Sequence, residues 1–237
     1  MIFFVYVKTY VTKVCEQLGK EPKFVTSPSG IKSRYTDKET AEIFTMVMSG
    51  RINKTIVQML QKNGINAVGL SGVDARVIEA ERKKTLLIVN EKGRKQAIDG
   101  GYTGKITKIN SVFIKLLLDQ GFTPVISPIA ISEESEFLNV DGDRAAAYVA
   151  GSVGCDKVLF ITNVDGLLMD NKLVTKLTLA EAKEIRPKIG PGMEKKILAS
   201  TEALDMGVKE ALIANGQREN PISSAIAHDN CTVIRHD

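Results

Sequence analysis

The chain has 237 residues, of which 43% are hydrophobic and 25% charged, with a formal net charge of +4. These values are ordinary for a soluble globular protein, and the charge is too small to indicate nucleic-acid binding. The apolar run that begins at Met1 stops at Lys8, which is too short for a membrane span and lacks a cleavage site. Scattered cysteines without metal-site or disulfide spacing favour a reducing compartment. We therefore expect a cytoplasmic protein of one large α/β domain, or of two tightly joined lobes.

Short apolar runs alternate along the chain with longer stretches of helical spacing. The first predicted helix begins at Thr36, which would cap it while Glu39 completes a capping box. Apolar residues then recur at helical spacing as far as Ile56. A strand of the buried type is predicted at 67–72, and a second strand at 85–89 is followed by a turn at 90–93.

The remaining elements follow the same alternation. Asn110 is predicted to cap a helix that Gly121 closes. Strands are expected at 124–128, at 157–161 as a fully buried strand, and at 211–214, with helices at 143–153 and about 194–206. Such strands separated by helices predict a three-layer α/β/α sandwich with a mainly parallel central sheet. Ligands of such sheets bind at the carboxyl ends of the strands.

Two groups of residues suit a substrate that carries a carboxylate. Arg34 lies at the entrance of the capped helix, where its planar fork and the helix amides would attract two carboxylate oxygens. Asn139 could hydrogen-bond a substrate, and Asp143 could orient a cationic side chain. The alternatives are a surface arginine beside an ordinary cap, and an aspartate that merely caps a helix.

Two further groups suit a nucleotide. Glycines at 190 and 192 would let backbone approach a phosphate at a helix start. Lys196 in the first turn opposes the helix dipole, which indicates either a role at a phosphoryl group or a solvated lysine. The segment 162–166 directly follows a predicted strand, and it is either a nucleotide loop or a plain turn.

These motifs occur together and in order, and the sequence resembles the acetylglutamate kinase branch of the amino acid kinase family from about Cys15 to Ile234. The resemblance is carried by residues 34–37, 50–54, 69–74, 139–143 and 192–196. It implies that the whole chain is one kinase domain, with a substrate-binding lobe at about 1–150 and a nucleotide-binding lobe at 151–237. It also implies a homodimer.

The resemblance further implies residue roles. Arg34 and Asn139 would bind the substrate, while Asp143 would organise the catalytic Lys196, which stabilises the phosphoryl group in transfer. The residues expected to contact ATP are Thr162, Asn163, Gly166 and Gly192. Magnesium would bridge the phosphates, with no protein ligand assigned to it. The family usually has Asp where Asn163 stands.

Residues 27–36 are similar to kinases that phosphorylate aminoadipate or glutamate held on LysW, a small acidic carrier protein, in lysine and arginine biosynthesis. A charge pattern supports this assignment independently. Between Arg76 and Lys108 there are nine basic and four acidic residues, a local surplus that exceeds the net charge of the whole chain. A basic hairpin would attract an acidic carrier. The alternative is a hairpin that is merely solvated.

Forming an acyl phosphate needs no general base, because a carboxylate is already ionised at neutral pH. One departure from the family lies at the start, where its Lys-x-Gly-Gly strand and glycine-rich turn are absent. The N-terminal strand and part of the phosphate cradle are therefore expected to be missing. Two other functions stay open: an acetylglutamate kinase that uses the free substrate, and a non-catalytic ligand-binding remnant of such a kinase.

Overall fold

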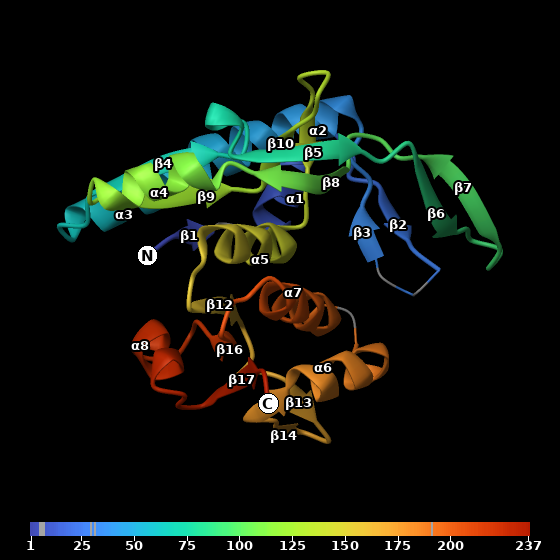
Figure 1. Cartoon of the computed structure of the whole chain (residues 1–237). Helices are drawn as coiled ribbons and strands as arrows, with labels where there is room; N and C mark the ends of the chain where they lie inside the picture. The colour runs from blue at the N-terminus through green and yellow to red at the C-terminus, as the bar shows by residue number, and fades with distance from the viewer. Residues whose placement is uncertain (5–7, 29, 31, 191) are drawn as a thin grey trace. The chain divides into compact units, whose positions relative to one another are not determined.

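The computed structural model describes residues 1–237 except 5–7, 29, 31 and 191. Parts of the motifs considered above therefore lie outside the described residues, namely Tyr6, Val7, Ser29, Ile31 and Pro191. The chain forms two compact units, Met1–Ala145 and Ala146–Asp237, and the helix α5 (Gly142–Val153) contains the boundary (Figure 1). Each unit has its own sheets and its own packed core.

The first unit is built on a parallel sheet. In it β9 (Thr123–Ser127) lies between β4 (Ala67–Ser71) and the short β1 (Phe3–Phe4), and both pairings are parallel. This confirms the strands predicted at 67–72 and 124–128. We expected the opening strand of the fold to be missing, but the first residues supply a two-residue strand. The helical elements of this unit are α1 (Lys8–Gln17), α2 (Lys38–Thr45), the π-helix η1 (Met46–Ile52), α3 (Asn53–Lys62) and α4 (Ser111–Asp119).

Two more four-stranded sheets complete the first unit. One has the order β11-β10-β5-β8, from β11 (Phe137–Asn139), β10 (Ile129–Ile131), β5 (Ile78–Arg82) and β8 (Gly104–Ile109). The other has the order β3-β2-β6-β7, from β3 (Lys32–Arg34), β2 (Phe24–Thr26), β6 (Thr85–Val89) and β7 (Lys95–Asp99). A short 3-10 turn, η2 (Asp74–Arg76), precedes β5. The predicted strand at 85–89 and its turn are confirmed as the β6–β7 hairpin, which lies at the far end of this unit from α3 and α4 (Figure 1).

The second unit has one mixed sheet of order β12-β16-β17-β15. Its strands β12 (Lys157–Thr162) and β16 (Glu210–Asn215) run parallel, β17 (Cys231–Arg235) is antiparallel to β16, and β15 (Lys176–Thr178) is parallel to β17. A small hairpin of β13 (Leu168–Met169) and β14 (Lys172–Leu173) stands apart from this sheet. The helical elements are α6 (Leu179–Ile185), η3 (Arg186–Lys188), α7 (Met193–Asp205) and α8 (Pro221–Ile226).

One strand prediction was wrong in its burial. We expected the strand at 157–161 to be fully buried, but in β12 buried Val158 and Phe160 alternate with exposed Lys157 and Ile161. The strand is at the edge of its sheet, and α7 packs against the buried residues. An alternating pattern is typical of a strand with one covered face.

One cap prediction was also wrong. Asn110 caps α4 as expected, accepting a hydrogen bond from the Phe113 amide at 3.2 Å. At the start of α2, however, the cap is Asp37, whose carboxylate accepts from the Thr40 amide at 2.8 Å. Thr36 is fully buried and bonds to a distant strand instead. Within the described part of the chain, no helix is both long enough and apolar enough to cross a membrane.

Candidate functional site

The first unit places the segment that carries Arg34 beside Asn139. Thr36 is the connecting residue, because its hydroxyl accepts a hydrogen bond from Asn139 Nδ2 at 3.0 Å. Asn139 ends β11, so its side chain is positioned by strand pairing with β10. Two residues that are more than a hundred positions apart in sequence are thus in direct contact, and both belong to predicted substrate motifs.

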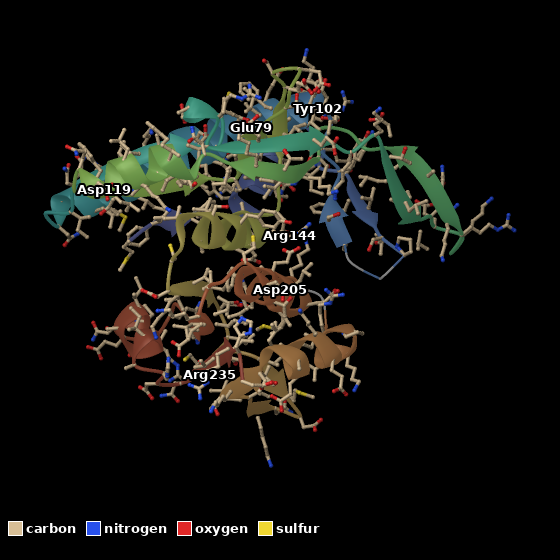
Figure 2. The ribbon with its side chains drawn as sticks, viewed as in Figure 1. Glu79, Tyr102, Asp119, Arg144, Asp205 and Arg235 are labelled. Atoms are coloured by element: carbon tan, nitrogen blue, oxygen red, sulfur yellow. The ribbon has the colours of Figure 1, made fainter. Side chains whose placement is uncertain are left out.

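A third segment, which the sequence analysis missed, joins this contact. The Tyr102 amide (residue labelled in Figure 2) donates to the Thr36 carbonyl at 2.7 Å, and the Asn139 amide donates to the Tyr102 carbonyl at 2.8 Å. Gly101 has a φ of 58°, and a Cβ there would lie 2.3 Å from the Thr36 carbonyl oxygen. Only glycine permits so close a backbone approach. The pair Gly100-Gly101 was the available sequence signal.

Arg34 is half-buried and is held by protein contacts. Its guanidinium donates to the Thr12 hydroxyl in α1 and lies 5.9 Å from the ring centroid of Phe24. Both contacts fix the direction of the fork, as a binding arginine requires. Asp143 lies in the first turn of α5 and is also half-buried. The substrate role of Arg34 and the orienting role of Asp143 stay predictions.

Two of the motifs that carried the family resemblance hold the sheet together. Asn53 is fully buried, and its Nδ2 donates to the carbonyls of Leu70 at 3.1 Å and Val125 at 2.8 Å, so it joins β4 and β9. A Cβ at Gly69 would lie 2.0 Å from Asn53 Oδ1, which explains the glycine. The Asp74 carboxylate accepts from the Ser71 amide and hydroxyl at 2.6 and 2.8 Å.

In the second unit, two predicted nucleotide residues lie where neighbouring parallel strands end. Thr162 is paired in register with Asn215, the last residue of β16, and the Gly216 amide donates to the Thr162 carbonyl at 2.8 Å. Asn163 is exposed directly after the strand. The carboxyl ends of two adjacent parallel strands are the usual ligand-binding edge of such a sheet.

The loop after β12 is held to the loop after β16 by an ion pair that the sequence analysis did not identify. Asp165 accepts from Arg218 Nε at 2.8 Å and from Asn215 Nδ2 at 2.9 Å, and Arg218 Nη2 lies 2.7 Å from its other oxygen. Arg218 and Asn215 lower the pKa of the Asp165 carboxyl by these hydrogen bonds. The sequence signal was Asn-Gly directly after a predicted strand.

The two predicted glycines differ in their surroundings. Gly166 has a φ of 154°, and a Cβ there would lie 2.5 Å from the Thr232 hydroxyl, so close packing requires this glycine. Gly192 has a φ of 96° and precedes α7, with open space around the position of a Cβ. The backbone at Gly192 is therefore accessible to a ligand, as a phosphate site at a helix start needs.

Lys196 lies in the first turn of α7, and its Nζ is 5.8 Å from the ring centroid of Phe160 in β12. This contact places the lysine near the carboxyl-terminal half of β12, which ends at Thr162. The second unit thus collects Thr162, Lys196 and the start of α7 on neighbouring elements. Among the described residues, no three histidine, cysteine or acidic side chains are grouped so that they could share a metal ion.

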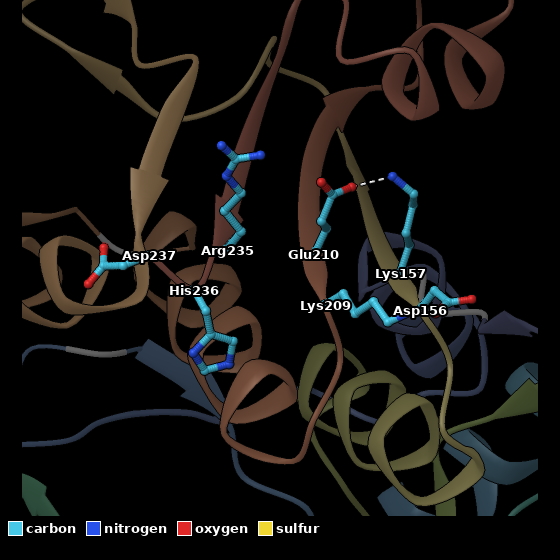
Figure 3. Close-up of a pocket in the computed structure, with 7 residues that line it drawn as sticks. All are labelled: Asp156, Lys157, Lys209, Glu210, Arg235, His236 and Asp237. Carbon is cyan, nitrogen blue, oxygen red and sulfur yellow. Dashed lines mark hydrogen bonds and ion pairs between the residues drawn. The ribbon is translucent and has the colours of Figure 1, made fainter.

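The pocket drawn in Figure 3 lies at the other end of the same strands. It has a volume of about 720 Å³ and surrounds the amino ends of β12 and β16. Its lining residues are Asp156, Lys157, Lys209, Glu210, Arg235, His236 and Asp237. Lys157 pairs with Glu210 and Lys209 with Asp156, so four of these charges neutralise one another. We assign it no part in the candidate site.

Comparison with known proteins identifies the relatives of this chain. The model of the amino acid kinase family matches residues 7–215. A Nitrosopumilus maritimus protein, provisionally named LysW-aminoadipate/LysW-glutamate kinase, is 90% identical over 227 residues, which cover 96% of this chain and 85% of that protein. A Sulfolobus acidocaldarius protein named LysW-aminoadipate/LysW-glutamate kinase is 46% identical over 217 residues, covering 91% of this chain and 82% of that protein.

Solved structures agree at the level of the fold. A Streptococcus mutans protein superimposes with a TM-score of 0.76 at 22% identity, covering 97% of this chain and 83% of that one. The N-acetylglutamate synthase of Neisseria gonorrhoeae, in complex with coenzyme A and N-acetyl-glutamate, gives a TM-score of 0.77 at 21% identity, covering 97% of this chain and 50% of that one. At these identities the likeness concerns the fold alone.

Proposed function

This chain belongs to the amino acid kinase family, and we propose that it transfers the γ-phosphoryl group of ATP to the side-chain carboxylate of 2-aminoadipate or glutamate bound to the carrier protein LysW. The product would be an acyl phosphate used in lysine and arginine biosynthesis in the cytoplasm. The observation that carries the proposal is the identity of 90% and 46% with the two proteins named for this reaction, each aligned over more than nine-tenths of the chain.

The first unit would bind the substrate. Arg34 presents a guanidinium whose planar fork suits a carboxylate, and the hydrogen bond to Thr36 holds Asn139 beside the segment that carries Arg34. Asn139 uses its Nδ2 toward Thr36, which leaves its carbonyl oxygen to accept a hydrogen bond from an amide or amine of the substrate. Asp143 would orient the catalytic lysine.

The second unit would bind the nucleotide. Thr162, Asn163 and the adjoining Gly166 form the loop at the carboxyl end of β12, and the accessible backbone at Gly192 precedes the positive end of α7. Lys196 would neutralise charge on the phosphoryl group as it moves. Oxygen atoms such as those of Thr162 and Asn163 are the donors that Mg²⁺ and its bound waters prefer, and the ion would supply further charge neutralisation at the phosphates.

The chemistry needs alignment and positive charge. The substrate carboxylate is ionised at neutral pH, so one of its oxygens attacks the γ-phosphorus directly while the bond to the ADP oxygen breaks. ADP leaves with the bonding electrons, and no proton has to be moved. The proposal therefore assigns the carboxylate to Arg34 and Asn139 and the phosphoryl group to Lys196.

The acidic carrier would dock on the β6–β7 hairpin. Glu79 is already paired with Arg76 and Lys108. Among the described residues, five cations of the basic stretch have no ion-pair partner, and these are Lys84, Lys92, Arg94, Lys95 and Lys105. The adjoining ends of β2 and β6 line a hollow of about 820 Å³ that includes Phe24, Lys32 and Lys92. Unpaired positive charge beside an apolar ring suits an acidic protein partner.

One assay tests the proposal and its alternatives. ATP turnover is measured with LysW-bound aminoadipate, LysW-bound glutamate and free N-acetylglutamate. The proposal predicts turnover with at least one carrier-bound substrate and little with the free one. Turnover with free acetylglutamate alone would show an acetylglutamate kinase. Binding without turnover of any substrate would show a non-catalytic protein.

We also propose a homodimer. Helix α4 presents Val112 and Leu116, which are 78% and 54% exposed. These residues are four apart and so lie on one face of the helix. An apolar face of this kind is typical of a buried contact between subunits.

A further inference from the structure

We propose that Arg82 is a positioning residue that fixes the carrier-docking hairpin onto the substrate residues Thr36 and Asn139. The inference rests on the proposed function, because it concerns how a docked carrier is coupled to the carboxylate it delivers. Arg82 would touch neither substrate nor nucleotide. It would act through the segment 100–102, called here the hairpin base, which connects β7 to β8.

Arg82 ends β5 and contacts the hairpin base in two ways. Its Nε donates to the Gly101 carbonyl at 2.7 Å, and its guanidinium carbon lies 4.5 Å from the ring centroid of Tyr102. Two carboxylates hold the guanidinium from other elements, Glu136 at 3.3 Å and Asp99 at 3.7 Å. With one carbonyl, one ring and two acids around it, the orientation of the side chain is determined.

The hairpin base is closely packed against neighbouring backbone. A Cβ at Gly100 would lie 1.6 Å from the Lys83 carbonyl oxygen, and one at Gly101 would lie 2.3 Å from the Thr36 carbonyl oxygen. The base is therefore packed directly between two stretches of backbone. Because Tyr102 bonds through its amide to Thr36 and through its carbonyl to Asn139, a shift of the base must displace at least one of these residues.

A second connection runs through the sheet itself. The hairpin strand β6 pairs with β2 at Val89 and Thr26. Strand β2 pairs in turn with β3, and Phe24 of β2 is opposite Arg34 of β3. The hairpin is thus continuous with the strand of the predicted carboxylate-binding arginine. Burial, followed by the nearby Asp99 carboxylate, raises the pKa of the Tyr35 phenol, which agrees with a closely packed polar cluster between the hairpin and the substrate residues.

Docking of the carrier and use of its cargo would then depend on different residues. The exposed cations of the hairpin attract the carrier, whereas Arg82 keeps the hairpin base aligned with Thr36 and Asn139. Loss of Arg82 should spare the affinity for the carrier and impair the use of its cargo. A purely structural arginine would not separate these two quantities.

The test compares Arg82→Ala and Arg82→Lys with Arg76→Ala, a matched control. Arg76 precedes the other end of β5 and makes one exposed ion pair with Glu79. The measurements are kcat and KM for LysW-bound substrate, KM for ATP, and the Kd of LysW without cargo by isothermal titration calorimetry. For Arg82→Ala we expect kcat/KM for the bound cargo to fall about tenfold or more, the loss typical of a removed charged hydrogen bond.

The Kd of empty LysW should stay within about twofold of the wild-type value, since the exposed cations of the hairpin determine it. The KM for ATP should also stay within about twofold of the wild-type value. Arg82→Lys should recover part of the activity, because it keeps the charge but cannot donate to Gly101 in the same geometry. Arg76→Ala should keep the kcat of the wild type and change at most the Kd of LysW, because its guanidinium contacts Glu79 and not the hairpin base. If circular dichroism shows that Arg82→Ala does not fold, Arg82→Lys and Glu136→Gln replace it in the test. For both variants we expect a lower kcat/KM for the bound cargo and an unchanged Kd for empty LysW.

Three outcomes would overturn the inference. One is full activity of Arg82→Ala on LysW-bound cargo. Another is a loss of activity and of LysW binding to the same extent, in proportion to the amount of folded protein. The third is wild-type protein that turns over no carrier-bound substrate, which would refute the proposed function as well. The first two leave the proposed function intact.

Discussion

Lys196 has the most demanding proposed role among the single residues. A cation in the first turn of α7 opposes the helix dipole, which agrees with the proposed role at a phosphoryl group. We predict that Lys196→Met lowers kcat by roughly 100- to 1000-fold, as removal of a donor to the developing charge does. The KM for ATP should change far less. Steady-state kinetics at saturating LysW-bound substrate measure both.

Lys195→Met is the control, because Lys195 is adjacent on the same turn and is not assigned to the phosphoryl group. It should keep kcat within about threefold of the wild type. Equal losses in the two variants would show that the kinetics respond to the charge of the helix end in general, and Lys196 would lose its assignment.

Asn53 illustrates a motif residue whose role is stability. Its buried amide satisfies carbonyls of two strands, so Asn53→Ala leaves buried acceptors unpaired. We predict a loss of about 1–3 kcal/mol in the free energy of unfolding, measured by urea denaturation. Asn63→Ala at the exposed end of the same helix should change it by less than about 0.5 kcal/mol. A tolerated Asn53→Ala would contradict the structural assignment.

Glu210 predicts how stability depends on pH. Its carboxyl bonds to Lys157 and lies 3.0 Å from His228 Nε2, and Lys157 foremost lowers its pKa. Because the pKa is lower in the folded state, the stabilisation is present at neutral pH and is lost as pH falls through the folded value. Glu210→Gln should therefore be less stable than the wild type at pH 7, with a difference that shrinks as the pH falls below the ordinary range of a glutamate carboxyl.

Urea denaturation at several pH values measures this dependence. Glu219→Gln, which changes an exposed acid of the same unit that among the described residues has no ion pair with Lys157 or His228, is the control for the loss of a surface carboxylate. A Glu210→Gln difference that stays constant or grows in acid would refute the assigned direction.

At the scale of elements, the β6–β7 hairpin makes the sharpest prediction. The double variant Arg94→Glu/Lys95→Glu should raise the KM for LysW-bound substrate by at least about tenfold at low salt, because it reverses charge on the proposed docking surface. The effect should shrink as ionic strength rises. The KM for ATP should not change.

The matched control is Lys13→Glu/Lys62→Glu, which changes the net charge equally on exposed positions of α1 and α3. If both double variants raise the KM alike, only the overall charge of the protein attracts the carrier, and the hairpin has no special part in docking.

At the scale of the whole molecule, we predict a homodimer that depends on α4. Val112→Glu/Leu116→Glu places two charges on its exposed apolar face and should convert the dimer into a monomer in sedimentation velocity experiments, since buried unpaired charge is strongly unfavourable. Ile226→Glu, at an exposed apolar position of α8, is the control and should stay dimeric. A monomeric wild type would disprove the prediction.

The strands and helices were largely predictable because they follow from local patterns. Apolar runs at 67–72 and 124–128, and the turn at 90–93, produced the expected β4, β9 and hairpin. Burial was less predictable. The apolar residues of β12 predicted a fully buried strand, but its position at the sheet edge leaves Ile161 45% exposed, and strand order is not encoded in any single segment.

For caps and long-range contacts, the sequence predicted the type of residue but not which residue would form the contact. Thr36 and Asp37 are both capping residues by type, and local sequence could not tell which of them would cap α2. Asn139, which follows a hundred residues later, bonds to Thr36 and leaves the cap to Asp37. The same holds for Asp165 and Arg218, which are separated by fifty-three residues. Such pairs form only after distant strands have been placed.

The sequence by itself determined the family, the order of the elements, the ordered motifs and the positive charge of the hairpin, because each is a property of residue type and spacing along the chain. Only the tertiary structure decided that Thr36, Tyr102 and Asn139 interlock, that Arg82 holds the hairpin base, and that Asn53 and Gly69 serve the sheet. These are contacts between segments far apart in sequence, and their free energy depends on distances and burial that no local pattern specifies.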